Sequence, residues 1–194
     1  SRERSAREEA ERLRSDAERR RLEKQVIAAE LKLMQAQVEP HFLFNTLAAV
    51  QHLIEVDPTA ANRMLSSLIR YLRAALPQMR TQESTVRQEF DLARAYLDIA
   101  AMRLCGRLTT EFSVPADLAF VPMPPMMLIS LVENAITHGV EECCDNCNVT
   151  VSATEQQGRL IVRVADTGAG LGEAKPGGGI GLSNIRERLK ALYG

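Results

Sequence analysis

The sequence has no tryptophan and few aromatic residues of any kind, since they make up only 4% of its 194 residues. A hydrophobic core must then be built mainly from Leu, Ile, Val, Met and Ala, as in helical bundles. Net charge is also nearly absent, at −1, so composition gives no case for nucleic-acid binding. Apolar runs stay well below the roughly eighteen residues of a membrane-spanning helix, so no span is expected within the sequence.

A signal peptide is lacking as well, because residues 1–21 are strongly charged. We therefore expect a cytosolic segment of one or two domains, with a membrane sensor only as an upstream part of a longer protein.

Cysteine is scarce, and the four cysteines are expected to be free thiols in a reducing cytosol: Cys105, Cys143, Cys144 and Cys147. The last three lack the paired CxxC spacing of structural zinc sites, and no histidine follows them closely. The favoured interpretation is a cysteine-rich surface loop, and a redox-sensitive loop is the alternative.

The first half of the chain has the periodicity of long helices. Residues 2–24 mix both signs of charge, with Glu3–Arg7 and Glu8–Arg12 at the i,i+4 spacing that supports a helix. Apolar residues then recur alternately four and three apart, at Leu22, Val26, Ala29, Leu33, Ala36, Pro40, Leu43, Leu47, Val50 and Ile54. A second stripe runs beside this one, so the wide apolar face indicates a four-helix bundle. His41 and Asn45 fall at the polar shoulder of this face.

Two prolines interrupt the pattern. Pro40 lies inside it and predicts a kink beside His41, because proline removes a backbone hydrogen bond. Asp57-Pro58 ends the helix and begins a second one, with Ala61, Leu65, Leu68, Leu72 and Ala75 on one face up to Pro77. The short connection predicts an antiparallel hairpin, and its uncovered apolar surface predicts a homodimer.

The second half is expected to be a mixed α/β layer. Residues 86–105 indicate a third helix, with Ala93, Leu97, Ala100 and Leu104 on one face. Strands are expected at 108–114, 149–154 and 159–165, the last two joined by a turn at 156–158. Helices are expected at about 126–138 and 182–192.

Three segments of this half carry the chemistry when taken together. Residues 131–139 (LVENAITHG) place Glu133 and Asn134 on an apolar helix, as an oxygen ligand for nucleotide-bound Mg²⁺ would require. Asp166 ends an apolar strand, where its carboxylate can accept a hydrogen bond from an amine such as that of adenine. The glycine-rich segment 177–184 runs into a helix N-terminus, which is a phosphate-binding arrangement. It is neither a Walker A motif nor a Rossmann fingerprint.

In order and spacing, these segments resemble the N, G1 and G2 boxes of the GHKL ATP-binding domain, which gyrase, MutL and histidine kinases share. Residues 37–47 (QVEPHFLFNTL) resemble the phosphoacceptor motif of LytS-like sensor histidine kinases. Residues 181–194 resemble the G2 box and following helix of the same family. The resemblance covers roughly residues 25–194.

The resemblance implies a fold of class α+β, in which a helical-hairpin dimerisation bundle precedes an α/β-sandwich ATP-binding domain. The expected boundaries are a signalling coiled-coil helix at 1–25, the dimerisation and phosphotransfer hairpin at 26–80, a connecting helix at 81–105, and the ATP-binding domain at 106–194. The family's domain usually continues through further strands beyond Gly194.

The resemblance also implies roles for individual residues. Asn134, beside Glu133, would coordinate Mg²⁺ between the ATP phosphates, and Asp166 would recognise adenine. The pocket wall, phosphate contacts and base of a lid at 171–178 would come from Gly168, Gly170, Gly179, Gly181 and Leu182. Three positions depart from the family pattern, because Thr137 replaces a common Lys and Ile129-Ser130 replaces a common Gln-Pro.

The expected function is that of a two-component sensor histidine kinase. His41 would attack the γ-phosphoryl group of ATP and then pass it to a response regulator. Glu39 is the nearest candidate to accept a proton or orient the ring, and Asn45 could hold a water that dephosphorylates the regulator. Two alternatives stay open, a pseudokinase scaffold and another GHKL ATPase. His52 and His138 are expected to lie on a helix surface or to contribute to packing.

Overall fold

The structure is a computed structural model that describes residues 7, 9, 11–14, 17, 40–143, 145–170 and 180–194. Internal contacts divide the chain into two units, residues 1–45 and 46–194. Residues 11–14 are helical, in agreement with the charged helix expected there. The apolar stripe before Pro40, the kink at that proline, and the expected lid at 171–178 lie outside the described residues.

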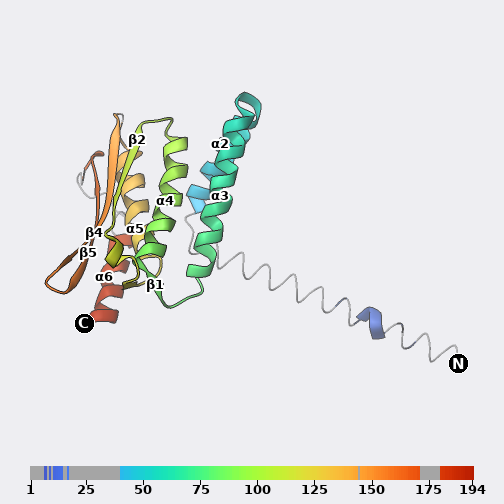
Figure 1. The fold of residues 1–194 in the computed structure, drawn as a ribbon. Coiled ribbons are helices and arrows are strands. Elements are labelled where there is room, and N and C mark those ends of the chain that lie inside the picture. The colour runs from blue at the N-terminus through green and yellow to red at the C-terminus, as the bar shows by residue number, and fades with distance from the viewer. Residues whose placement is uncertain are drawn as a thin grey trace. The chain divides into compact units, whose positions relative to one another are not determined.

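Helices α2 (Pro40–Val56) and α3 (Pro58–Gln78) are joined by Asp57 alone, and the chain reverses direction there (Figure 1). The Asp57 carboxylate caps α3 by accepting a hydrogen bond from the Ala60 amide at 3.0 Å. Pro58 follows as the first helical residue, where a missing N–H costs nothing. The predicted break at Asp57-Pro58 is confirmed, and α3, expected up to Pro77, ends one residue later at Gln78.

The buried face of α3 differs in part from the predicted stripe. Ala61, Leu68 and Ala75 are buried as expected, but Leu65 is 39% exposed and Tyr71 is fully buried. The reason is packing against the next helix, where the rings of Tyr71 and Tyr96 lie 6.0 Å apart. Apolar side chains of α2 and α3 that do not pack against α4 remain exposed, namely Leu47, Ile54, Val56, Leu65 and Ile69.

Helix α4 (Val86–Arg103) is the central helix of the larger unit. It begins with a capping box, in which the Thr85 amide donates to the Gln88 side chain at 3.1 Å and the Gln88 amide donates to the Thr85 hydroxyl at 3.4 Å. The predicted buried face is confirmed, since all of its members are buried: Ala93, Leu97, Ala100 and Leu104. The helix contacts α3, α5 and β2, so it is covered on several sides.

A three-stranded sheet forms in the order β2-β4-β5, with β2 (Leu108–Ser113) parallel to β4 (Cys147–Gln156) and β4 antiparallel to β5 (Arg159–Asp166). Gln157 and Gly158, with φ of 53° and 75°, make the tight turn between β4 and β5. The predicted hairpin is therefore confirmed. A small antiparallel pair, β1 (Ser84–Thr85) and β3 (Pro122–Met123), braces the start of α4, and a 3₁₀ turn η1 (Ala116–Leu118) precedes β3.

Helices α4 and α5 (Met127–Asn134) lie on one face of this sheet (Figure 1). Alternate residues of β4 are buried under them: Cys147, Val149, Val151 and Ala153. Helix α6 (Ile180–Tyr193) contacts α5 and leaves apolar side chains exposed, namely Leu182, Leu189, Leu192 and Tyr193. The predicted class, helices followed by a mixed α/β layer, is confirmed.

Candidate nucleotide and phosphoacceptor sites

The helix carrying Asn134 changes type at that residue. Apolar side chains of α5 enter the core on one side, while Leu131 and Asn134 are half-buried. From Ala135 to Val140 the chain continues as the π-helix η2, and the Glu141 amide donates to the Ile136 carbonyl at 2.8 Å. The sequence predicted one uniform helix to about residue 138. The wider π turn was missed, and such turns are frequent at functional sites.

Gly139, at the end of η2, contacts the loop that follows β5. The Ala169 amide donates to the Gly139 carbonyl at 2.9 Å. A methyl group added at Gly139 would overlap the Asp166 carboxylate, and one added at Gly168 would overlap the Gly139 backbone. The first two motifs therefore meet directly, with glycine at both contact points. Gly139 ends the motif at 131–139, but the sequence alone does not indicate a role for it.

Asp166 is held at the end of β5 by its own loop. Its Oδ1 accepts a hydrogen bond from the Gly168 amide at 3.0 Å. Next to it, the Thr167 hydroxyl accepts from the Asn148 amide at 2.8 Å, and the Thr167 amide donates to the Asn148 carbonyl at 3.0 Å. These bonds fix the loop to the neighbouring strand β4. Thr167 and Asn148 are supports that sequence reasoning missed, because their bonds span two strands.

A pocket of about 350 Å³ opens between α5, β5 and α6. It brings together Asn134, Asp166 and Leu182, which come from the three segments that carried the sequence motifs. Its full lining is Leu131, Asn134, Ala135, Ile161, Val162, Arg163, Val164, Asp166 and Leu182. The lining therefore mixes apolar side chains with the Asn134 amide, the Asp166 carboxylate and the side chain of Arg163.

The other predicted nucleotide residues stand outside this lining. Glu133 is half-buried on α5, and Gly168 and Gly170 lie in the loop after β5. Gly181 lies in the first turn of α6, and Gly179 lies outside the described residues.

The positions that depart from the family pattern also stand outside the pocket. Ile129 is buried in the core, and the Ser130 hydroxyl donates to the Met126 carbonyl at 2.9 Å. Thr137 is half-buried in η2 and is not part of the lining. None of these three positions therefore lines the pocket in the described part of the chain.

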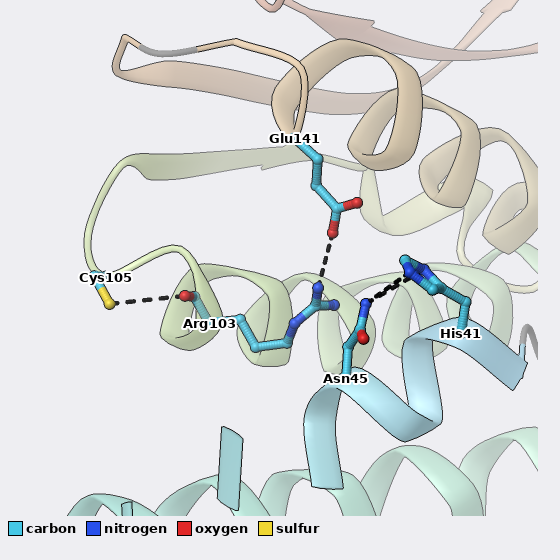
Figure 2. Close-up of polar contacts among 5 residues, drawn as sticks. All are labelled: His41, Asn45, Arg103, Cys105 and Glu141. Atoms are coloured by element: carbon cyan, nitrogen blue, oxygen red, sulfur yellow. Dashed lines mark hydrogen bonds and ion pairs between the residues drawn. The ribbon is translucent and has the colours of Figure 1, made fainter. Parts of the chain in front are cut away.

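His41 is exposed in the first turn of α2, and Asn45 lies one turn further along the same helix. The Asn45 amide nitrogen lies 3.0 Å from Nε2 and 3.3 Å from Nδ1 of the imidazole (Figure 2). An amide N–H donates here to a ring nitrogen, so Asn45 limits the orientation of the ring. Glu39 lies outside the described residues.

The connecting helix is tied to the segment after η2 by an ion pair. Arg103 Nη2 and Glu141 Oε1 are 2.9 Å apart, with 14% and 24% of their side chains exposed (Figure 2).

In the cysteine-containing segment after Glu141, burial raises the pKa of the Cys147 thiol, and the nearby Cys143 thiol raises it further. Cys144 lies outside the described residues. No group of three or more metal-binding side chains gathers within the residues that the structure covers.

Among the helices described, none is both long and apolar enough to cross a membrane.

Curated sensor kinases match most of the chain in sequence. A solved histidine kinase domain, from the blue-light activated histidine kinase of Erythrobacter litoralis, aligns with a TM-score of 0.42 and 19% identity over 76% of this chain and 83% of that one. The Escherichia coli sensor histidine kinase YpdA is 33% identical over 86% of this chain and 31% of its own length. The Bacillus subtilis sensor protein LytS is 33% identical over 86% of this chain and 30% of its own length.

The chain thus spans about a third of the length of these curated relatives. The profile of the histidine kinase family matches residues 29–108, which include His41 and Asn45. The family match and the matches to the sensor kinases cover the same part of the chain. The chain therefore belongs to the histidine kinase family, and it is LytS-like.

Proposed function

We propose that this chain is the catalytic part of a two-component sensor histidine kinase. It binds ATP with Mg²⁺ in the pocket between α5, β5 and α6 and phosphorylates His41. The phosphoryl group then passes to an aspartate of a response regulator. The convergence of Asn134, Asp166 and Leu182 on one pocket is the observation that carries this proposal.

The chemistry of the pocket suits a purine nucleotide. The Asp166 carboxylate has several acceptor positions, so the bond from Gly168 leaves capacity for the exocyclic amine of adenine. Leu131, Ile161 and Leu182 offer apolar surface to the base. The amide oxygen of Asn134 is a hard ligand of the type Mg²⁺ prefers. Magnesium bound there would neutralise charge on the phosphates during transfer.

His41 has the exposure that a phosphoacceptor needs. A ring nitrogen attacks the γ-phosphorus, the bond from that phosphorus to the bridging oxygen breaks, and ADP leaves while the ring loses a proton. Asn45 holds the ring by its hydrogen bond before attack. Glu39 is proposed as the group that receives the proton, and Gly179 and Gly181 as phosphate contacts at the N-terminal end of α6.

We further propose that the working unit is a homodimer on the cytoplasmic side of a bacterial inner membrane, beneath a sensor domain. The exposed apolar side chains of α2 and α3 favour pairing with a second copy, since the burial of such side chains drives helix association.

The test is incubation of the dimeric chain with γ-labelled ATP and Mg²⁺. We expect acid-labile, alkali-stable phosphate on the wild type and on His52→Ala, an exposed histidine of the same helix, and none on His41→Ala. Label that persists on His41→Ala would overturn the assignment. Sustained ATP hydrolysis that survives the same substitution would identify another GHKL ATPase instead.

A further inference from the structure

Helix α5 begins without a cap from its own sequence. Its N-cap residue, Met126, has a left-handed backbone with φ of 62° and provides no side-chain cap. A helix start leaves several amides without intrahelical partners, and buried amides of this kind are costly unless another group accepts from them.

The missing acceptor comes from another helix. Glu89 of α4 is fully buried, and its Oε1 accepts from the Met126 amide at 3.0 Å while its Oε2 accepts from the Leu128 amide at 3.1 Å. A carboxylate at a helix N-terminus is also favoured by the helix dipole. The two oxygens of one side chain therefore accept from two amides of the same helix start, those of Met126 and Leu128.

The two hydrogen bonds from α5 to Glu89 constrain where α5 lies. Two bonds to two oxygens of one rigid carboxylate fix both the height of α5 along α4 and its rotation about its own axis. The far end of α5 carries Leu131 and Asn134, and Ala135 follows as the first residue of η2; all three line the pocket. Burial raises the pKa of Glu89, and the amide bonds lower it, so the carboxyl is kept at an electrostatic cost.

We propose that Glu89 is a positioning residue for the nucleotide site, which couples the connecting helix α4 to the pocket by holding the start of α5. Its effect on nucleotide binding rests on the function proposed above. Its hold on α5 does not, because the two amide bonds belong to the protein alone. The two parts are therefore tested by separate measurements on the same sample.

The experiment compares wild type, Glu89→Gln and Glu89→Asp with Asp91→Asn, which removes an exposed carboxylate from the same helix. A glutamine presents one oxygen and one NH₂ group, so one amide of α5 would face a donor. All variants are used as the full dimeric chain, after circular dichroism shows them folded. The readouts are amide hydrogen exchange, the amide NMR shifts of Asn134 and Ala135, and binding of a non-hydrolysable ATP analogue with Mg²⁺.

For Glu89→Gln we expect exchange at Met126 and Leu128 to speed up about 10-fold, and analogue affinity to fall about 10-fold, as the loss of one buried charge-assisted bond implies. The shifts of Asn134 and Ala135 should move as well, which local packing loss at Glu89 would not cause. Glu89→Asp should lie between wild type and Glu89→Gln, and Asp91→Asn should match wild type.

Unchanged exchange at both amides in Glu89→Gln would overturn the proposed hold on α5. Faster exchange with wild-type shifts at Asn134 and wild-type affinity would overturn the positioning role. A wild type that fails to bind the analogue would refute the proposed function, and exchange and shifts would still decide the role of Glu89. Should Glu89→Gln fail to fold, the same readouts on Glu89→Asp decide.

Discussion

Gly139 and Gly168 form the contact between η2 and the loop after β5, beside the pocket. Gly139 has ordinary backbone angles, so glycine is required there by space and not by conformation. Any side chain would enter the volume of the Asp166 carboxylate. The residue at position 139 therefore controls where Asp166 lies, although it contributes no functional group.

Gly139→Ala should displace Asp166 and weaken the site. We expect the free energy of unfolding to fall by about 1–3 kcal/mol, as for other overpacked positions, and nucleotide affinity to drop about 10-fold. The control is Gly106→Ala, because Gly106 has φ of 84° and open space around it. That change should cost about 1 kcal/mol through backbone strain alone and leave affinity unchanged. Chemical denaturation and calorimetric titration give both quantities, and equal affinities for the two variants would contradict the steric argument.

At the scale of elements, features with a local signal were predictable and features made by distant residues were not. The buried face of α4 and the turn at Gln157-Gly158 follow from spacing and from residue type, and the structure has both. The contacts from Glu89 to α5 and from Gly139 to Asp166 join residues far apart in the sequence. Periodicity cannot indicate such contacts.

The π-helix η2 was missed for a related reason. Its segment AITHGV has no turn residue before Gly139 and reads as ordinary helix. The buried face of α3 was only partly predicted, because Tyr71 packs on Tyr96 of a helix whose position the sequence does not fix.

The ion pair between α4 and the segment after η2 should contribute measurably to stability. A double-mutant cycle of Arg103→Ala and Glu141→Ala is expected to give a coupling energy of about 1–3 kcal/mol, because both side chains are largely buried. The matched pair is Arg70 and Asp98, 3.7 Å apart with 63% and 45% of their side chains exposed. There the coupling should stay below about 0.5 kcal/mol. Urea denaturation provides the values, and equal couplings for both pairs would refute this ranking.

At the scale of the whole molecule, α2 and α3 retain an apolar surface that this chain does not cover in the described residues. Its members are Leu47, Ile54, Val56, Leu65 and Ile69. The sequence predicted both the helices and the surplus apolar surface. It could not identify the exposed members, since those depend on which side of α3 packs against α4.

Replacing Ile54 and Leu65 by Glu together should convert the chain from a dimer to a monomer, because each association would then bury four carboxylates against apolar surface. The control Phe120→Glu changes a side chain that is 73% exposed on another part of the molecule, and it should remain dimeric. Sedimentation velocity over a range of concentrations distinguishes the two states. A wild type that sediments as a monomer throughout would exclude this interface.

The apolar side chains that α6 leaves exposed have a practical consequence at the bench. Environment-sensitive dyes such as ANS fluoresce when they adsorb to accessible apolar surface, whether or not a protein has melted. Such a dye should therefore fluoresce in the presence of the purified protein even when the protein is fully native. Dye-based thermal scans would start from a high baseline and could be misread as partial unfolding, so calorimetry or circular dichroism is the sounder way to follow its melting.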